Sequence, residues 1–276
     1  MKKKKHSRIW AVVGIILLGI VAVGSIYSHF GGFGTGPCAD ETEFMQYADQ
    51  VDNIKIPEKT KIVALGEASH GNVEFQQLKL SVFQNLVENA GIRAFALEGD
   101  YGGCEYVNRY IHGGEGTAEQ AAAAIGFAIY RTDEMADLIS YMRKYNETAK
   151  AGDDLRFYGF DMQNWSYNLQ YLTEACKASG IDVTELKKLE DNDEADGGYD
   201  IEEQTRIIME IKKELQESDA KDIKQADHLA DTLLQNISLG KVIDSAVEGN
   251  ALRDQRMAEN VMWILSMEEQ RGNACI

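Results

Sequence analysis

The stretch KIVALGEASHG (residues 61–71) joins a short apolar run to a polar loop. The apolar run, Lys61–Leu65, has the length and composition of a buried β-strand. Residues 93–97 (RAFAL) and 155–160 (LRFYGF) repeat this pattern further along the chain. Because segments with helical periodicity separate the three runs, the sequence predicts right-handed βαβ units and a parallel sheet.

Helices are predicted wherever apolar residues recur at helical spacing. They cover Val73–Ala90, Glu105–Ile111, Ala118–Phe127, Glu134–Ala149, Asn168–Ser179, Glu203–Glu217, Ala220–Leu239 and Ser245–Gln270. The buried face of the first is expected to comprise Phe75, Leu78, Val82, Phe83, Leu86 and Ala90. The last four helices follow one another without a strand, so the predicted fold class is α/β: a parallel sheet flanked by helices, with an additional helical lobe.

The amino terminus has the composition of a membrane anchor. Lys2–Lys5 precede Ile9–Tyr27, a run of nineteen residues without a charge. As a helix, that run would span about 28 Å, close to the thickness of the hydrocarbon core of a bilayer. The positive-inside rule then predicts a cytoplasmic segment 1–8, a single transmembrane helix 9–27, a linker 28–40 and an extracytoplasmic domain 41–276 at the cell membrane. A cleaved signal peptide remains the alternative.

Charge and cysteine content narrow the possible functions. The formal net charge is −17, which argues against a nucleic-acid partner, since such proteins neutralise phosphates with a basic face. The four cysteines, Cys38, Cys104, Cys176 and Cys275, show no CxxC spacing. Zinc-finger and thioredoxin-like functions therefore find no support, and buried, unreactive thiols are the main expectation, with a disulfide left open.

Polar side chains follow the predicted strands at the edge where ligands bind in open α/β sheets. The first strand leads into Glu67 and His70, the second ends in Glu98 and Asp100, and the third ends in Asp161. An imidazole surrounded by carboxylates suits a general base whose ring is held by an acidic neighbour. The sequence therefore indicates His70 as a base, against the alternative that Glu67 and His70 only satisfy backbone groups of their loop.

Two basic residues are candidates for the same site. Lys79 lies on the otherwise apolar face of its predicted helix, and because an unpaired buried ammonium is costly, a partner is expected, either a site carboxylate or a substrate oxyanion. Arg253 lies on the last predicted helix, on one face with Asn260. Trp165 and Tyr167 either line a pocket for an apolar substrate or belong to the core.

Other chemistries match the sequence less well. There is no GxSxG, P-loop, GxGxxG or HExxH motif, so no cofactor is expected. The chain has five histidines, and His112 and His228 lie in helix-like surroundings, where surface positions are expected. Metal-assisted hydrolysis by His70 and carboxylates stays open.

Six motifs occur in a characteristic order: LGEASHGNVEFQQLK (65–79), FALEGDYGG (95–103), VNRYI (107–111), RTDEMADLISYMRKYN (131–146), FYGFDMQ (157–163) and RDQRMAENVMW (253–263). Together they resemble the erythromycin esterase family over roughly residues 39–269. The resemblance implies an α/β fold with a helical lobe, and hydrolytic opening of a macrolide lactone ring, an antibiotic-resistance activity, in characterised members.

The resemblance also implies roles for individual residues. His70 would activate a water that attacks the ester carbonyl, while Glu67 and Glu98 orient the base or the water. Lys79 stands where the family often has arginine, and Arg253 belongs to a further motif that supports the substrate site. The expected substrate is a small-molecule ester or lactone, with no metal and no cofactor.

One departure from the family bears on activity. After the helix that carries RDxxMAxN, the family continues into a strand and an HNxH motif, whereas this chain ends at Ile276. A carboxyl-terminally truncated member is therefore expected. The alternative to an esterase is an inactive or non-catalytic membrane-tethered module.

Overall fold

The computed structural model describes residues 40–276 except 68, 191–199, 219–222, 243 and 274–275. The chain forms two compact units, residues 1–50 and 51–276. Within the first, the structure describes one short helix, α2 (Glu41–Phe44). The predicted transmembrane run, Ile9–Tyr27, lies outside the described residues, as does the predicted linker up to residue 39. Among the helices that the structure does describe, none combines the length and the apolar character that a membrane span requires.

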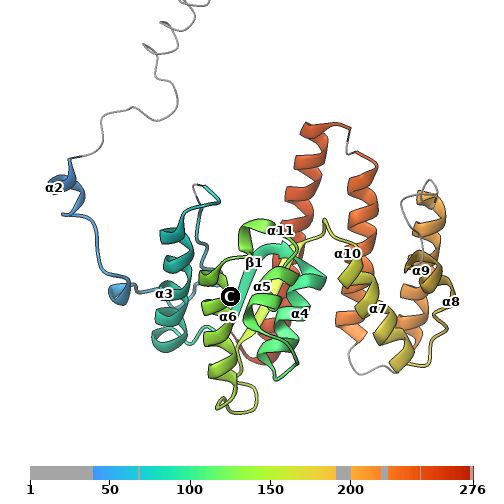
Figure 1. The fold of residues 1–276 in the computed structure, drawn as a ribbon, viewed down its shortest axis with the longest axis horizontal. Coiled ribbons are helices and arrows are strands. Elements are labelled where there is room, and N and C mark those ends of the chain that lie inside the picture. The colour runs from blue at the N-terminus through green and yellow to red at the C-terminus, as the bar shows by residue number, and fades with distance from the viewer. Residues whose placement is uncertain (1–39, 68, 191–199, 219–222, 243, 274–275) are drawn as a thin grey trace, which may run out of the picture. The chain divides into compact units, whose positions relative to one another are not determined.

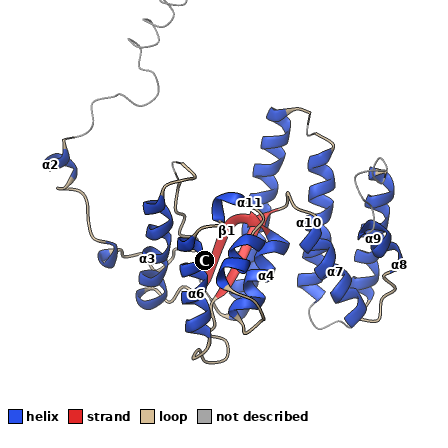
Figure 2. Ribbon diagram, in the orientation of Figure 1, coloured by secondary structure: helices blue, strands red, loops and turns tan. Residues whose placement is uncertain are grey.

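The sheet of the second unit consists of two parallel strands, β1 (Ala94–Asp100) and β2 (Arg156–Asp161). Ala94 lies opposite Arg156 and Leu97 opposite Gly159, with an irregularity in register before Asp100. The strands predicted at 93–97 and 155–160 are thus confirmed. Parallel strands need a long crossover, and the segment between them holds α4 (Tyr101–Ile111), α5 (Ala118–Ala124) and α6 (Asp133–Asn146). Figure 2 shows the two strands enclosed by helices.

The predicted first strand, Lys61–Leu65, is wrong, and the described sheet has two strands rather than three. Among the described residues, the backbone of this run bonds to Ile276 alone. Ile276 N donates to Lys61 O, and Val63 N donates to Ile276 O, each at 3.0 Å. A strand requires a ladder of such bonds, which composition alone cannot supply. Ile62 and Leu65 accordingly stay 40% and 46% exposed.

The remaining elements of the second unit are helices. Their bounds are η1 Val51–Asn53, α3 Val73–Asn89, α4 Tyr101–Ile111, α5 Ala118–Ala124, η2 Ala128–Tyr130, α6 Asp133–Asn146, α7 Ser166–Ala178, α8 Thr184–Glu190, α9 Ile201–Glu217, α10 Ile223–Gly240 and α11 Ala246–Arg271. All eight predicted helices are confirmed, and the short α8 was not predicted. Local signals fix several ends: Thr117 and Gln120 form a capping box at α5, and Gly272 ends α11 at φ +94°.

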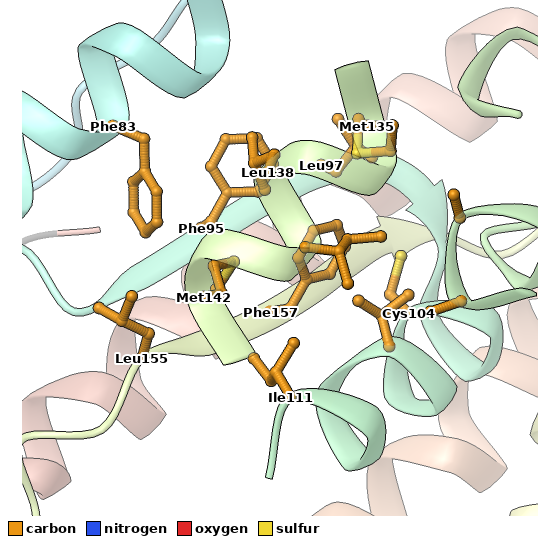
Figure 3. Packing of buried hydrophobic residues seen from close by; sticks show 14 of the residues in the cluster. Phe83, Phe95, Leu97, Cys104, Ile111, Met135, Leu138, Met142, Leu155 and Phe157 are labelled. Atoms are coloured by element: carbon orange, nitrogen blue, oxygen red, sulfur yellow. The ribbon is translucent and has the colours of Figure 1, made fainter. Parts of the chain in front are cut away.

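The main core lies between the sheet and helices α3, α4, α5 and α6. Figure 3 shows Phe83 from α3, Phe95 from β1 and Phe157 from β2 in the core. Their ring centroids lie 5.2 and 5.4 Å apart in succession, which is the spacing of favourable aromatic contacts. On α3 the predicted face is partly corrected, because Leu78 is 44% exposed and Ala90 is also exposed.

A second core joins α7, α8, α9 and α10, which Figure 1 shows grouped together. This confirms the predicted helical lobe. Helix α11 packs against both strands and against α10, so it connects the lobe with the sheet. His228 of α10 is buried at 4% exposure and stacks on Trp263 of α11, which corrects its expected surface position.

Two of the four cysteines lie in the described part of the chain. Cys104 and Cys176 are buried free thiols, as expected, while Cys38 and Cys275 fall outside the described residues. Burial raises the pKa of Cys104 well above its usual value and that of Cys176 to about 11. Both thiols therefore stay protonated and unreactive near neutral pH.

Candidate active site

The loop before α3 places His70 beside Glu67. The Nδ1 atom of the imidazole lies 3.2 Å from Oε2 of Glu67, three residues earlier in the chain. The His70 side chain is 56% exposed and that of Glu67 is 13% exposed. The carboxylate thus fixes the ring through Nδ1 and leaves Nε2 without a partner among the described residues.

Lys79 holds the other oxygen of Glu67. Its Nζ donates to Oε1 of Glu67 at 3.3 Å and to Oε1 of Gln76 at 3.1 Å. The Nε2 of Gln76 donates to the same Glu67 oxygen at 3.1 Å. Lys79 is 9% exposed, and its Nζ lies 5.6 Å from the ring centroid of Tyr130. Of the two partners expected for this buried lysine, a carboxylate or a substrate oxyanion, the structure shows the carboxylate of Glu67.

A second cluster forms at the carboxyl ends of the two strands. Nη2 of Arg253, on α11, donates to Oε1 of Glu98 at 2.6 Å and to Oδ2 of Asp161 at 2.5 Å. The Nε of Arg253 also donates to Oδ2 of Asp161, at 3.1 Å. Burial alone would lower the pKa of Arg253, but the hydrogen bonds and charges of Asp161 and Glu98 outweigh it and raise the pKa. The guanidinium therefore forms ion pairs with two carboxylates from neighbouring strands.

Asp100 forms hydrogen bonds with a different set of groups. Its carboxylate accepts hydrogen bonds from the backbone N–H of Gly103 at 2.8 Å, the backbone N–H of Asn164 at 3.2 Å and the side chain of Asn168 at 3.1 Å. It is the N-cap of α4 and is fully buried, and burial raises its pKa to about 7. Of the carboxylates expected to converge around His70, Asp100 therefore has a structural position instead.

One cavity of about 480 Å³ brings the main candidates together. Its polar lining includes Glu67, His70, Lys79, Glu98 and Tyr130. Its walls are otherwise largely apolar, with Val82, Phe83, Leu86, Phe95 and Leu97 among them. An apolar hollow with a few convergent polar groups is the usual form of a small-molecule site. Arg253 does not belong to this lining and reaches the site only through its bond to Glu98.

Tyr130 is a residue of this cavity that the sequence analysis did not single out. It ends η2, in the connection between α5 and α6, and is 2% exposed. The available signal is its position directly before the motif that begins at Arg131.

The two aromatic residues after β2 lie away from that cavity. Trp165 packs against the core of the helical lobe. Tyr167 stacks on Tyr171 with ring centroids 5.9 Å apart, and it lines a separate hollow of about 540 Å³ that also contains Arg131 and Asn164. Within the described part of the chain, no three side chains of the metal-binding types converge.

Comparison with known proteins relates the chain to the erythromycin esterase family. The model of the erythromycin esterase family matches residues 87–276, which include Glu98 and Arg253 but begin after Glu67 and His70. Erythromycin esterase type II of Escherichia coli is 32% identical over 108 residues, 39% of this chain and 25% of that protein. The putative hydrolase YbfO of Bacillus subtilis (strain 168) is 28% identical over 141 residues, 50% of this chain and 30% of that protein.

Solved structures share the fold. A protein from Bacillus cereus superposes with a TM-score of 0.64 at 21% identity, over 89% of this chain and 61% of that one. An erythromycin esterase mutant, EreC, in its open conformation gives a TM-score of 0.57 at 18% identity, over 86% of this chain and 63% of that one. The chain thus spans about a quarter to a third of the curated relatives and about three fifths of these structures.

Proposed function

The chain belongs to the erythromycin esterase family, and from this premise we propose that it is a hydrolase that cleaves an ester or a macrolide lactone with a water activated by His70. The observation that carries the proposal is the pair His70–Glu67, bonded at 3.2 Å and bordering the same cavity as Glu98. A base that is oriented by a carboxylate and faces an apolar hollow can activate water next to an apolar ester.

The proposed reaction assigns a step to each group. The free Nε2 of His70 takes a proton from water as the water oxygen attacks the carbonyl carbon. The carbonyl electron pair moves to its oxygen, which gives a tetrahedral oxyanion. As the intermediate collapses, the bond to the leaving alcohol breaks, and His70 returns the proton to that alcohol.

The carboxylates position the reacting groups. Glu67 accepts a hydrogen bond from Nδ1–H of His70, which fixes the tautomer that keeps Nε2 free to act as base. Glu98 orients the attacking water, and its own position is set by Arg253. Lys79 holds Glu67 in place through Oε1. Arg253 and Lys79, predicted to bind substrate, thus act in this proposal through the carboxylates they contact.

Replacing the base tests the proposal. We expect His70→Ala in the full chain to lower the hydrolysis of p-nitrophenyl butyrate, or of erythromycin, at least 100-fold, since a general base contributes about 10²–10⁴-fold. The thermal midpoint should stay unchanged, because His70 is largely exposed. His112→Ala is the matched control, since His112 bonds to Asp154 and lies outside the cavity.

Three results would contradict the proposal. Full activity of the His70→Ala variant would exclude His70 as the base. Loss of activity in the wild type on treatment with a chelator would favour the metal-assisted alternative instead. A folded wild-type chain that hydrolyses no ester would favour the non-catalytic module. The membrane anchor at residues 9–27 and the extracytoplasmic position stay predictions from sequence.

A further inference from the structure

The proposed hydrolysis needs a hydrogen-bond donor for the oxyanion that forms when water attacks the carbonyl. Such donors, held in place before the reaction, supply a large part of the rate enhancement in acyl transfer. The donor must border the cavity that holds His70, and it must not be committed to another acceptor.

The two cations near the site are already committed. Lys79 directs its ammonium at Glu67 and Gln76, and its side chain is 11% exposed. Arg253 donates to Glu98 and Asp161 and does not line the cavity. Turning either cation toward a substrate would leave a carboxylate without its partner, and for Asp161 that carboxylate is fully buried.

Tyr130 meets both requirements. It lines the cavity together with His70, Glu67 and Glu98. Its hydroxyl makes no hydrogen bond to a described residue, although the residue is only 2% exposed. Burial, and then the charges of Glu98 and Glu67, raise the pKa of this hydroxyl well above its ordinary value. It therefore stays protonated, and able to donate, at any pH where the protein would work.

The ring of Tyr130 is fixed independently of its hydroxyl. It ends η2 within the main core, and Lys79 lies 5.6 Å from its centroid. Held in this way, the hydroxyl needs little reorganisation when charge develops in front of it.

From this geometry we propose that Tyr130 is a further catalytic residue, whose hydroxyl donates a hydrogen bond to the oxyanion of the tetrahedral intermediate. The inference rests on the proposed hydrolase function. No proton is transferred from Tyr130: the water proton goes to Nε2 of His70 and then to the leaving alcohol.

The variant Tyr130→Phe isolates the hydroxyl. The ring keeps its packing and its contact with Lys79, so the thermal midpoint should match that of the wild type. With p-nitrophenyl butyrate and the full chain, we expect kcat to fall about 100-fold, as for the loss of one oxyanion donor, while KM changes less than twofold. The pH at which activity rises should not move, because His70 and Glu67 keep their positions.

Tyr110→Phe is the matched control. Tyr110 is also buried, its ring also faces a cation, Arg143 at 4.3 Å, and it lies outside the cavity. We expect this variant to keep wild-type kcat and KM.

The outcomes separate the inference from the proposed function. An active wild type with unchanged kcat in Tyr130→Phe would overturn the role of Tyr130 alone. A lower kcat accompanied by a shifted pH profile or a lower thermal midpoint would also overturn it, since the hydroxyl would then be structural. A wild type inactive on every ester, with the same thermal midpoint as its variants, would overturn both.

Discussion

At the level of single residues, Glu67 links the candidate base, His70, to helix α3. One oxygen of its carboxylate faces Nδ1 of His70. The other accepts from Lys79 and Gln76, which lie three residues apart on the buried side of α3. Because three donors surround it, the carboxylate has little freedom to rotate away from the imidazole. The exposed ring of His70 thus takes its orientation from a side chain that is itself fixed by the helix.

Arg253 gives a prediction for stability. Arg253→Met keeps the volume but leaves Asp161 buried without its cation, and Glu98 without its partner. Breaking a buried ion pair on one side costs about 3–5 kcal/mol. We expect about 3 kcal/mol in the free energy of unfolding, measured with urea, because Glu98 is 41% exposed and water can replace part of its contact.

Two further variants serve as controls for this pair. Arg253→Lys keeps the charge but not the planar fork, so it should lose less than Arg253→Met. In the double variant with Asp161→Asn, the loss should be smaller than the sum of the two single losses. Additive losses would show that the contact between Arg253 and Asp161 does not stabilise the fold.

At the level of elements, the helices were predictable because the spacing of apolar residues within each helix indicates its buried face. Helix α3 shows this well: Val82, Phe83 and Leu86 are buried as their spacing predicts. The run Lys61–Leu65 has equally clear composition, yet a strand exists only through a partner elsewhere in the chain, and composition does not name that partner. Helix α8 was not predicted because its seven residues are too few to show a clear helical spacing of apolar residues.

The residues of the candidate site differ in the same way: some can be found from local sequence, and one is placed by tertiary packing. Glu67 and His70 are close in sequence, Glu98 lies near the end of β1, and Asp161 ends β2, so local patterns were sufficient to find them. Tyr130 lies in the connection between α5 and α6 and lines the cavity through tertiary packing. In the sequence, its position directly before the motif at Arg131 marks it only indirectly.

The contact between α4 and α5 leads to a prediction at this level. A Cβ on Gly103 would lie 2.0 Å from the backbone oxygen of Ala124, so Gly103→Ala forces the two helices apart. Since backbone cannot yield as a side-chain tip can, we expect a loss of about 3 kcal/mol in the free energy of unfolding by urea. Gly240→Ala in α10 is the control: nothing lies within 4 Å, and a gain of up to about 1 kcal/mol is expected. Equal effects of both substitutions would contradict this close approach.

For the molecule as a whole, two buried groups make the stability of the fold depend on pH in opposite directions. The pKa of Asp100, at the sheet, rises from 3.8 to about 7, chiefly through burial. The pKa of His228, in the helical lobe, falls from 6.5 to about 3, through burial and the charge of Lys212. Folded Asp100 binds its proton more tightly than the unfolded chain does, and folded His228 binds its proton less tightly.

The signs follow from this difference in proton binding. The contribution of Asp100 is complete below about pH 4 and is lost as the pH rises through 7. The contribution of His228 is complete above about pH 6.5 and is lost as the pH falls toward 3. In the wild type, the two groups change the stability of the fold in opposite directions as the pH rises. A variant that removes one group leaves the pH dependence that the other group causes.

We therefore expect two variants to change the thermal midpoint with opposite pH profiles between pH 4 and 7.5. Asp100→Asn, which keeps an acceptor for the N–H of Gly103, should gain stability relative to the wild type as the pH rises from 4 to 7. His228→Phe, which keeps the ring stacked on Trp263, should gain relative to the wild type as the pH falls from 6.5. Midpoints that run parallel to the wild type across this range would show that these two groups do not govern the response of the fold to acid.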